Sequence, residues 1–305
     1  WSQPGGMAHN VSWHCRLMRH EEDDYNWNDC EADNLGQVPV TLLICFFGLL
    51  GNGAVLCFLG SHVRRNPVIA YVLSLAATNF TFLFSIAVAL VMFYSLGSFC
   101  DSLVSWHVTD VLKITIVFTF TASVYLLTAF GAIMSLPVLP RCHHSWRWPL
   151  LVCALLWALS FLLTVTLYFI PVVLTIFILS YLLAVLTLTL SGLTLLARAL
   201  CCKGRSPPRD LCVVVLLSAI FFPFLTADFG YWLLLRLLDF SAFAFNSSLP
   251  LACLNSSAPP VIYFLAGSRT KNFTLSVSAA FQRAFEDVSQ PQGGSETPGK
   301  TTVET

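Results

Sequence analysis

The sequence predicts an all-α protein, a seven-transmembrane-helix bundle followed by an amphipathic eighth helix. Composition is the first of two observations behind this prediction. Of the 305 residues, 56% are hydrophobic and only 10% are charged, whereas a soluble domain is about a quarter charged. The mean hydropathy of +0.75 leaves too little polar surface to cover a water-soluble globule. The second observation is the regular recurrence of long apolar runs.

Seven apolar runs are each long enough to cross a bilayer, since a spanning helix needs about 20 mostly apolar residues. They cover residues 38–60, 67–94, 104–136, 148–169, 172–200, 210–238 and 249–267. The stretch from Pro149 to Leu200 is about twice as long as one span requires. Pro171 is the expected turn within it, because proline disrupts a continuing helix. Six spans, with this stretch as one buried bend, is the alternative.

Basic residues predict the orientation, because Lys and Arg gather in short cytoplasmic loops. With an outside N-terminus, the inner segments collect most of them, and only Arg16 and Arg19 stay clearly outside. Two glycosylation acceptors agree with this topology, since Asn10-Val-Ser and Asn246-Ser-Ser both fall outside. The sequence therefore predicts a multi-pass plasma-membrane protein with an extracellular N-terminus.

The expected organisation has four parts. An extracellular segment covers residues 1–37, the seven-helix domain 38–267, a surface helix 268–287 and a disordered cytoplasmic tail 288–305. The surface helix is predicted because apolar residues recur there at helical spacing. The tail is polar and contains Gly, Pro, Ser and Thr, a composition typical of disorder.

The eleven cysteines are scattered and lie mostly in apolar runs. Cys15, Cys30 and Cys100 fall in the outer segments, so one pair among them forms a disulfide bond or all three stay free thiols. Cys201 and Cys202 end an apolar run beside basic residues. That setting is typical of reversible palmitoylation.

Several short stretches, taken in order, carry a resemblance to known receptors. Gly51-Asn52 resembles the first-helix signature of rhodopsin-like receptors. The segments from Leu151 to Ser160 and from Asn255 to Phe264 are similar to the fourth helix and the seventh-helix end of Mas-related receptors. The run Arg283-Ala-Phe-Glu-Asp287 resembles the tail of that family. The chain is thus identified as a divergent member of the Mas-related family of G-protein-coupled receptors.

The chain departs from the family pattern at three polar positions. Asn79 stands where the family has an aspartate that binds sodium, and a neutral amide binds cations far less well. No acid or arginine precedes Arg141 at the inner end of the third run, where the family carries Glu-Arg-Cys. Pro259 replaces the asparagine of the family's Asn-Pro motif, although Tyr263 is kept. The loop between the fourth and fifth runs is nearly absent, together with the two cysteines that the family pairs there.

Ionisable groups within spans are costly and are therefore candidate ligand-binding residues. Asp228, in the sixth run, is either the counter-charge for a cationic ligand or the partner of Lys113 or of backbone donors. Asp110 and Lys113 share a helix face, and such residues more often pair with each other than with a ligand. Tyr231 and Trp232 either line the outer cavity or belong to the aromatic belt at the membrane interface.

The candidate G-protein contacts lie at the inner side. They are Tyr263 and three basic residues, Arg141, Arg198 and Arg205. The tendency of basic residues to lie inside explains the arginines equally well. The hydroxyl-rich tail offers phosphorylation sites for arrestin, although its composition alone supplies as many.

The resemblance implies a cell-surface receptor for a peptide or small cationic ligand that signals through heterotrimeric G proteins. The alternative is a non-signalling relative that acts as a membrane interaction partner or ligand decoy, which the departures favour. A transporter or channel is disfavoured because no inverted repeat is visible. Enzymatic chemistry finds no support, and no metal or cofactor is expected. A net charge of zero also argues against nucleic acid as a partner.

Overall fold

The computed structural model describes residues 27–60, 67–95, 106–135, 147–201 and 248–268, and four short helical pieces at 216–217, 221–222, 225–226 and 229–230. The chain divides into two compact units, Trp1–Gly36 and Gln37–Thr305. The packing described below lies within the second unit.

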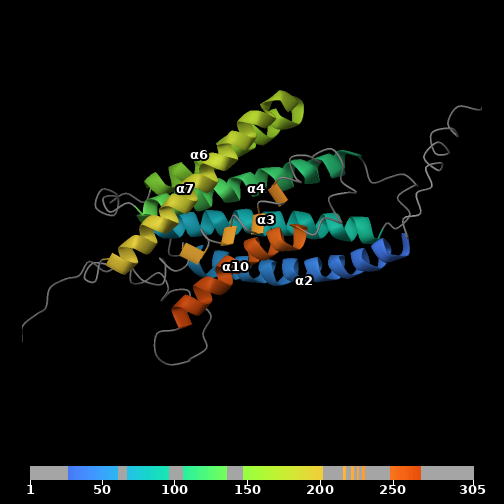
Figure 1. Cartoon of the computed structure of the whole chain (residues 1–305), viewed down its shortest axis with the longest axis horizontal. Helices are drawn as coiled ribbons and strands as arrows, with labels where there is room; N and C mark the ends of the chain where they lie inside the picture. The colour runs from blue at the N-terminus through green and yellow to red at the C-terminus, as the bar shows by residue number, and fades with distance from the viewer. Residues whose placement is uncertain are drawn as a thin grey trace, which may run out of the picture. The chain divides into compact units, whose positions relative to one another are not determined.

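Every long element in these ranges is helical, which confirms the all-α fold (Figure 1). The elements are α2 (Trp27–Leu59), α3 (Pro67–Ser95), α4 (Trp106–Ser135), α6 (Arg147–Phe169), the 3₁₀ helix η2 (Pro171–Val173), α7 (Leu174–Cys201) and α10 (Ser248–Ser268). Among the described residues, five helices are long and apolar enough to cross a membrane, namely α2, α3, α4, α6 and α7. Their apolar parts match the first five predicted runs within two residues at each end, except that the third begins at Asp110 and not at residue 104.

The start of α2 differs from the prediction. The helix begins at Trp27, not at residue 38, because the prediction located the apolar stretch and not the helix that carries it. The membrane-length part of α2 is Gln37–Leu59.

The turn between α6 and α7 lies where the sequence predicted it. Ile170 donates its N–H to Thr166 O at 2.8 Å, and Val173 donates to Ile170 O at 3.0 Å across the 3₁₀ turn that opens with Pro171. The chain then enters α7, which is itself of membrane length. The stretch from Pro149 to Leu200 therefore forms two helices, and the alternative of one buried bend is wrong.

Helix α4 is the most enclosed of the five membrane-length helices. The most apolar stretch of α4 is 67% buried, whereas the corresponding stretches of α6 and α7 are 22% and 28% buried. It packs against α3, α6 and α7. The largest fully buried side chains lie mainly on α3, α4 and α7 and include Phe82, Leu83, Ile86, Ile116, Leu126, Phe130, Leu188 and Leu195. The core therefore forms around α4.

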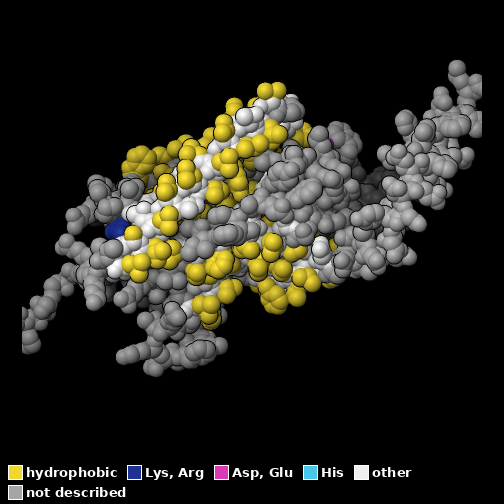
Figure 2. Space-filling model, viewed as in Figure 1, with side chains coloured by type: hydrophobic (Ala, Val, Ile, Leu, Met, Phe, Trp, Pro, Cys, Tyr) yellow, Lys and Arg dark blue, Asp and Glu magenta, His cyan; other side chains and the backbone are white. Residues whose placement is uncertain are grey.

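The outer faces of α6 and α7 are apolar. Leu155, Leu162 and Leu183 each expose more than half of their surface, and hydrophobic side chains cover much of the visible face of both helices (Figure 2). Exposing an apolar surface of this extent to water is unfavourable. Contact with lipid removes this unfavourable exposure.

Hydroxyl groups on these faces are satisfied within their own helix. Thr166, Thr187, Thr189 and Thr194 each donate to the carbonyl four residues earlier at 2.7–2.8 Å. In hydrocarbon an unsatisfied polar group costs several kcal/mol. These bonds therefore allow threonine on a lipid-facing surface.

Candidate functional site

An ion pair lies near the start of α4. Lys113 Nζ is 3.8 Å from Asp110 Oδ1, and the side chains are 18% and 26% exposed, respectively. Tyr168, from the end of α6, lies close enough to interact with the Asp110 carboxylate. Among the side chains described between Gln37 and Leu265, Asp110 is the only carboxylate. The pairing expected from their spacing is therefore present.

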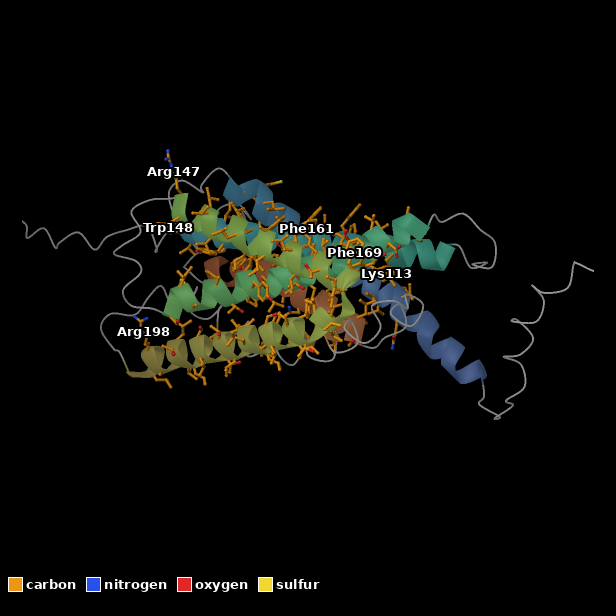
Figure 3. The ribbon with its side chains drawn as sticks, turned by 90° about the horizontal axis from the view of Figure 1, so that it is seen from above. Lys113, Arg147, Trp148, Phe161, Phe169 and Arg198 are labelled. Atoms are coloured by element: carbon orange, nitrogen blue, oxygen red, sulfur yellow. The ribbon has the colours of Figure 1, made fainter. Side chains whose placement is uncertain are left out.

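The labelled charged side chains occupy the two ends of the helix packing (Figure 3). Lys113 lies toward one end, whereas Arg147 and Arg198 lie toward the other. Arg147 is exposed at the first residue of α6. The Asp110–Lys113 pair is thus separated by the apolar part of the bundle from these two arginines.

The other predicted ligand residues, Asp228, Tyr231 and Trp232, lie outside the described residues. The neighbouring helical piece at 229–230 is described, and Phe229 is 1% exposed. Its ring centroid lies 5.9 Å from that of Phe82 on α3. The turn that follows Asp228 therefore packs against the core.

Four rings form an aromatic cluster that sequence reasoning missed. Phe229 meets Phe120 on α4 at 5.2 Å, and Phe120 stacks on Tyr181 of α7 at 6.2 Å. Phe82 lies 6.5 Å from Phe120. These distances suit favourable edge and offset contacts. The sequence shows only phenylalanines in apolar runs, a pattern that does not distinguish this cluster from any other core.

Asn79 takes part in a buried hydrogen bond between α3 and α4. Its side chain is 2% exposed, and Ser123 Oγ donates to its Oδ1 at 3.0 Å. A buried carboxylate here would need a compensating charge, whereas the amide needs none. Asn79 therefore makes a neutral hydrogen bond at the position where the resemblance expects a cation-binding aspartate.

Asn52 links α2 to α10. Its Nδ2 donates to Gly48 O at 2.8 Å and to Ser256 O at 3.1 Å. Nearby in the same helix pair, the thiols of Cys45 and Cys253 lie 3.7 Å apart, and both residues are fully buried. The close approach of the two helices depends on glycine, because a Cβ at Gly48 would clash with Ser257 Oγ on α10 and lie 2.9 Å from Ser257 Cβ.

Two of the predicted G-protein contacts are described. Tyr263, on α10, is 2% exposed, so it is a packed core residue. Arg198, in the last turn of α7, donates from Nη1 to Ser135 O at 2.9 Å. Arg141 and Arg205 lie outside the described residues.

The modification sites fall mostly in the same undescribed parts. These are Asn10, Asn246, Cys15, Cys100 and Cys202, together with the predicted surface helix and tail from residue 269 on. Cys30 lies in the first turn of α2. Cys201 is the last residue of α7. The four cysteines whose side chains are described, Cys45, Cys57, Cys153 and Cys253, are free. Across the described ranges, no group of three or more His, Cys, Asp or Glu residues gathers in a way that could hold a metal ion.

Long apolar helices with lipid-compatible outer faces, linked by buried polar contacts, define a multi-pass membrane protein. Comparison with curated proteins shows the family. The chain is 32% identical over 289 residues to Proto-oncogene Mas of Mus musculus, covering 87% of this chain and 88% of that protein. It is 32% identical over 309 residues to Mas-related G-protein coupled receptor member X2 of Homo sapiens, covering 88% and 91%. No family model matches the chain.

The chain therefore belongs to the Mas-related family of G-protein-coupled receptors. A similar relative, Mas-related G-protein coupled receptor member B4 of Mus musculus, is 28% identical over 290 residues, 87% of this chain. These relatives are receptors and not enzymes. Family and apolar helices together indicate a multi-pass protein of the plasma membrane with a G protein and a ligand as partners.

Proposed function

We propose that this chain is a cell-surface receptor for a peptide or small cationic ligand, with its N-terminus outside and seven spans within 38–267. The proposal includes a surface helix at 268–287 and a cytoplasmic tail from 288. The observation that carries the ligand class is the position of Asp110. It is a carboxylate at the end of α4 opposite Arg147 and Arg198, and it is partly open to solvent.

The Asp110–Lys113 pair suits exchange with a ligand. Its 3.8 Å separation is longer than the 2.7–2.9 Å of a strong charge-assisted hydrogen bond. An incoming ammonium or guanidinium can thus gain a shorter contact than Lys113 makes. Tyr168 adds an aromatic side chain beside the carboxylate, which further suits a cation.

Further residues complete the proposed outer site. Asp228, Tyr231 and Trp232 belong to it because of their place in the sixth run, and Phe229 supports this by anchoring the adjacent turn to α3 and α4.

On the inner side, Arg141 and Arg205 are proposed contacts of the heterotrimeric G protein, with arrestin at the tail. Glycosylation at Asn10 and Asn246 and palmitoylation at Cys201 and Cys202 complete the proposal.

The test is G-protein dissociation in cells that display the tagged chain, measured against a panel of cationic peptides and small amines. Asp110→Asn alone leaves Lys113 without this partner, so the double variant Asp110→Asn, Lys113→Gln is measured beside it. Both variants are expected to raise the half-maximal concentration of an active ligand about tenfold, as the loss of one charge-assisted hydrogen bond predicts. An unchanged half-maximal concentration for both would remove Asp110 from the site.

A non-signalling receptor relative is the second candidate. The neutral Asn79–Ser123 contact favours it, because the resemblance places a cation-binding switch residue at that position. Between Lys113 and Ser135, the rest of α4 contains no acid or arginine, which favours this candidate as well. Normal surface display and ligand binding without dissociation of any G-protein class would support this candidate.

A further inference from the structure

The inner end of α4 is held by a side chain from α7. Ser135 is the last residue of α4, and its carbonyl oxygen accepts the 2.9 Å hydrogen bond from Arg198 Nη1. Arg198 lies 63 positions further along the chain, in the last turn of α7. The contact therefore joins the ends of two different membrane helices.

This carbonyl needs an external partner. The last four carbonyls of a helix lack partners within it, and Ser135 is only 8% exposed, so water reaches it poorly. The Ser135 hydroxyl donates to Ala132 O at 2.8 Å and satisfies one of the four. Arg198 satisfies another, and its positive charge is favoured at the negative end of the helix dipole.

Arg198 is the innermost of three polar contacts between α4 and α7. Tyr125 OH donates to Ser180 Oγ at 2.8 Å, and Thr128 Oγ1 donates to Ala184 O at 3.3 Å. The partner numbers rise together along both helices, so the helices run in the same direction. The two outer contacts join neutral groups, and the innermost one carries a charge.

We propose that Arg198 is a restraining residue that clamps the inner ends of α4 and α7 and thereby opposes G-protein activation. This inference rests on the proposed signalling function and reverses the role that the sequence predicted for Arg198. The inner half of α4 contains no acid or arginine that could anchor its own end. Opening the inner face for a G protein requires the Arg198–Ser135 bond to break.

The two roles for Arg198 predict opposite outcomes. Arg198→Gln removes the positive charge and the guanidinium group that donates to Ser135 O. Ligand-independent G-protein dissociation per displayed receptor is therefore expected to rise about three- to tenfold. A G-protein contact would instead lose signal on the same substitution. Arg198→Lys keeps the charge but places it on one nitrogen at the end of a shorter side chain. Its basal dissociation is expected to fall between those of wild type and Arg198→Gln.

Two matched controls separate the clamp from general effects. Arg147→Gln removes an exposed cation at the same end of the bundle and is expected to leave basal dissociation unchanged. Ser135→Ala removes the serine hydroxyl and its bond to Ala132 O but keeps the carbonyl that Arg198 binds, so basal dissociation is expected to rise less than in Arg198→Gln. A rise in either control equal to that of Arg198→Gln would overturn the inference.

Amide hydrogen exchange of the purified full-length protein in lipid nanodiscs tests, independently of signalling, whether Arg198 stabilises the end of α4. Arg198→Gln is expected to speed exchange at residues 132–135 about threefold or more, because the uncapped last turn of α4 frays. Unchanged exchange there would overturn the inference. If the wild-type chain activates no G protein, the proposed function fails, but exchange still decides whether Arg198 holds α4.

Discussion

Replacing Asn79 with aspartate converts a neutral hydrogen-bond acceptor into a buried carboxylate. Asn79 is 2% exposed and accepts one hydrogen bond, from Ser123 Oγ at 3.0 Å. Ser123 is itself 8% exposed, so little water reaches the new charge. An uncompensated buried charge typically costs about 3–5 kcal/mol. We therefore expect Asn79→Asp to be destabilised by an amount of this order in a sodium-free buffer.

Sodium should reverse much of this loss in the variant. A cation that binds only the folded state adds about 2.7 kcal/mol when its concentration is 100 times its dissociation constant. The assay is the thermal unfolding midpoint of purified protein in sodium chloride and in choline chloride at equal ionic strength. Asn79→Asp is expected to unfold at a higher temperature in sodium chloride, and the wild type at the same temperature in both salts.

Asn79→Ser is the control, since it changes the side chain without adding charge and should not respond to sodium. Two results would refute the reasoning. One is a wild-type midpoint that itself rises with sodium, which would mean that the Asn79–Ser123 contact is not cation-independent. The other is an Asn79→Asp variant as stable as wild type in choline, which would place residue 79 in a more solvated setting than the structure shows.

The contact between α2 and α10 yields two further predictions. Gly48→Ala should destabilise the protein by about 1–3 kcal/mol, because its Cβ would clash with Ser257 Oγ on α10 and lie 2.9 Å from Ser257 Cβ. Gly60→Ala, whose added Cβ has no atom within 4 Å, should be near neutral in the same unfolding assay. Cys45 and Cys253, 3.7 Å apart, should be joined by a membrane-permeant thiol oxidant into one disulfide, seen by mass spectrometry of digested protein and absent from Cys253→Ala. Finding both thiols free after full oxidation of exposed cysteines would argue against this helix pairing.

The first five spans could be predicted from the sequence because they depend on local composition. An uninterrupted apolar run has one low-energy arrangement in a bilayer, in which the backbone bonds to itself. Pro171 marked the turn between α6 and α7 for an equally local reason, its inability to continue a helix. The start of α2 at Trp27 was missed, since polar residues can extend a helix without any change that hydropathy detects.

The pairwise contacts of the candidate site could not be predicted in the same way. Asp110 and Lys113 were expected to pair because both lie on one helix, and their spacing sets the distance. The partner of Arg198 depends instead on where α4 ends relative to α7. The partner of Asn79 likewise depends on which face of α4 meets α3. The sequence showed an arginine near a helix end and an amide in an apolar run, and tertiary packing gave each its role.

G-protein dissociation in cells that display the tagged chain tests the central claim, receptor function, most directly. It is read without ligand and with cationic peptides and small amines, beside Asp110→Asn, Lys113→Gln. The proposed function predicts dissociation above mock-transfected cells that at least one cationic ligand increases and that the double variant weakens. Full surface display with no dissociation from any G-protein class, by a chain that still binds a ligand, would contradict it.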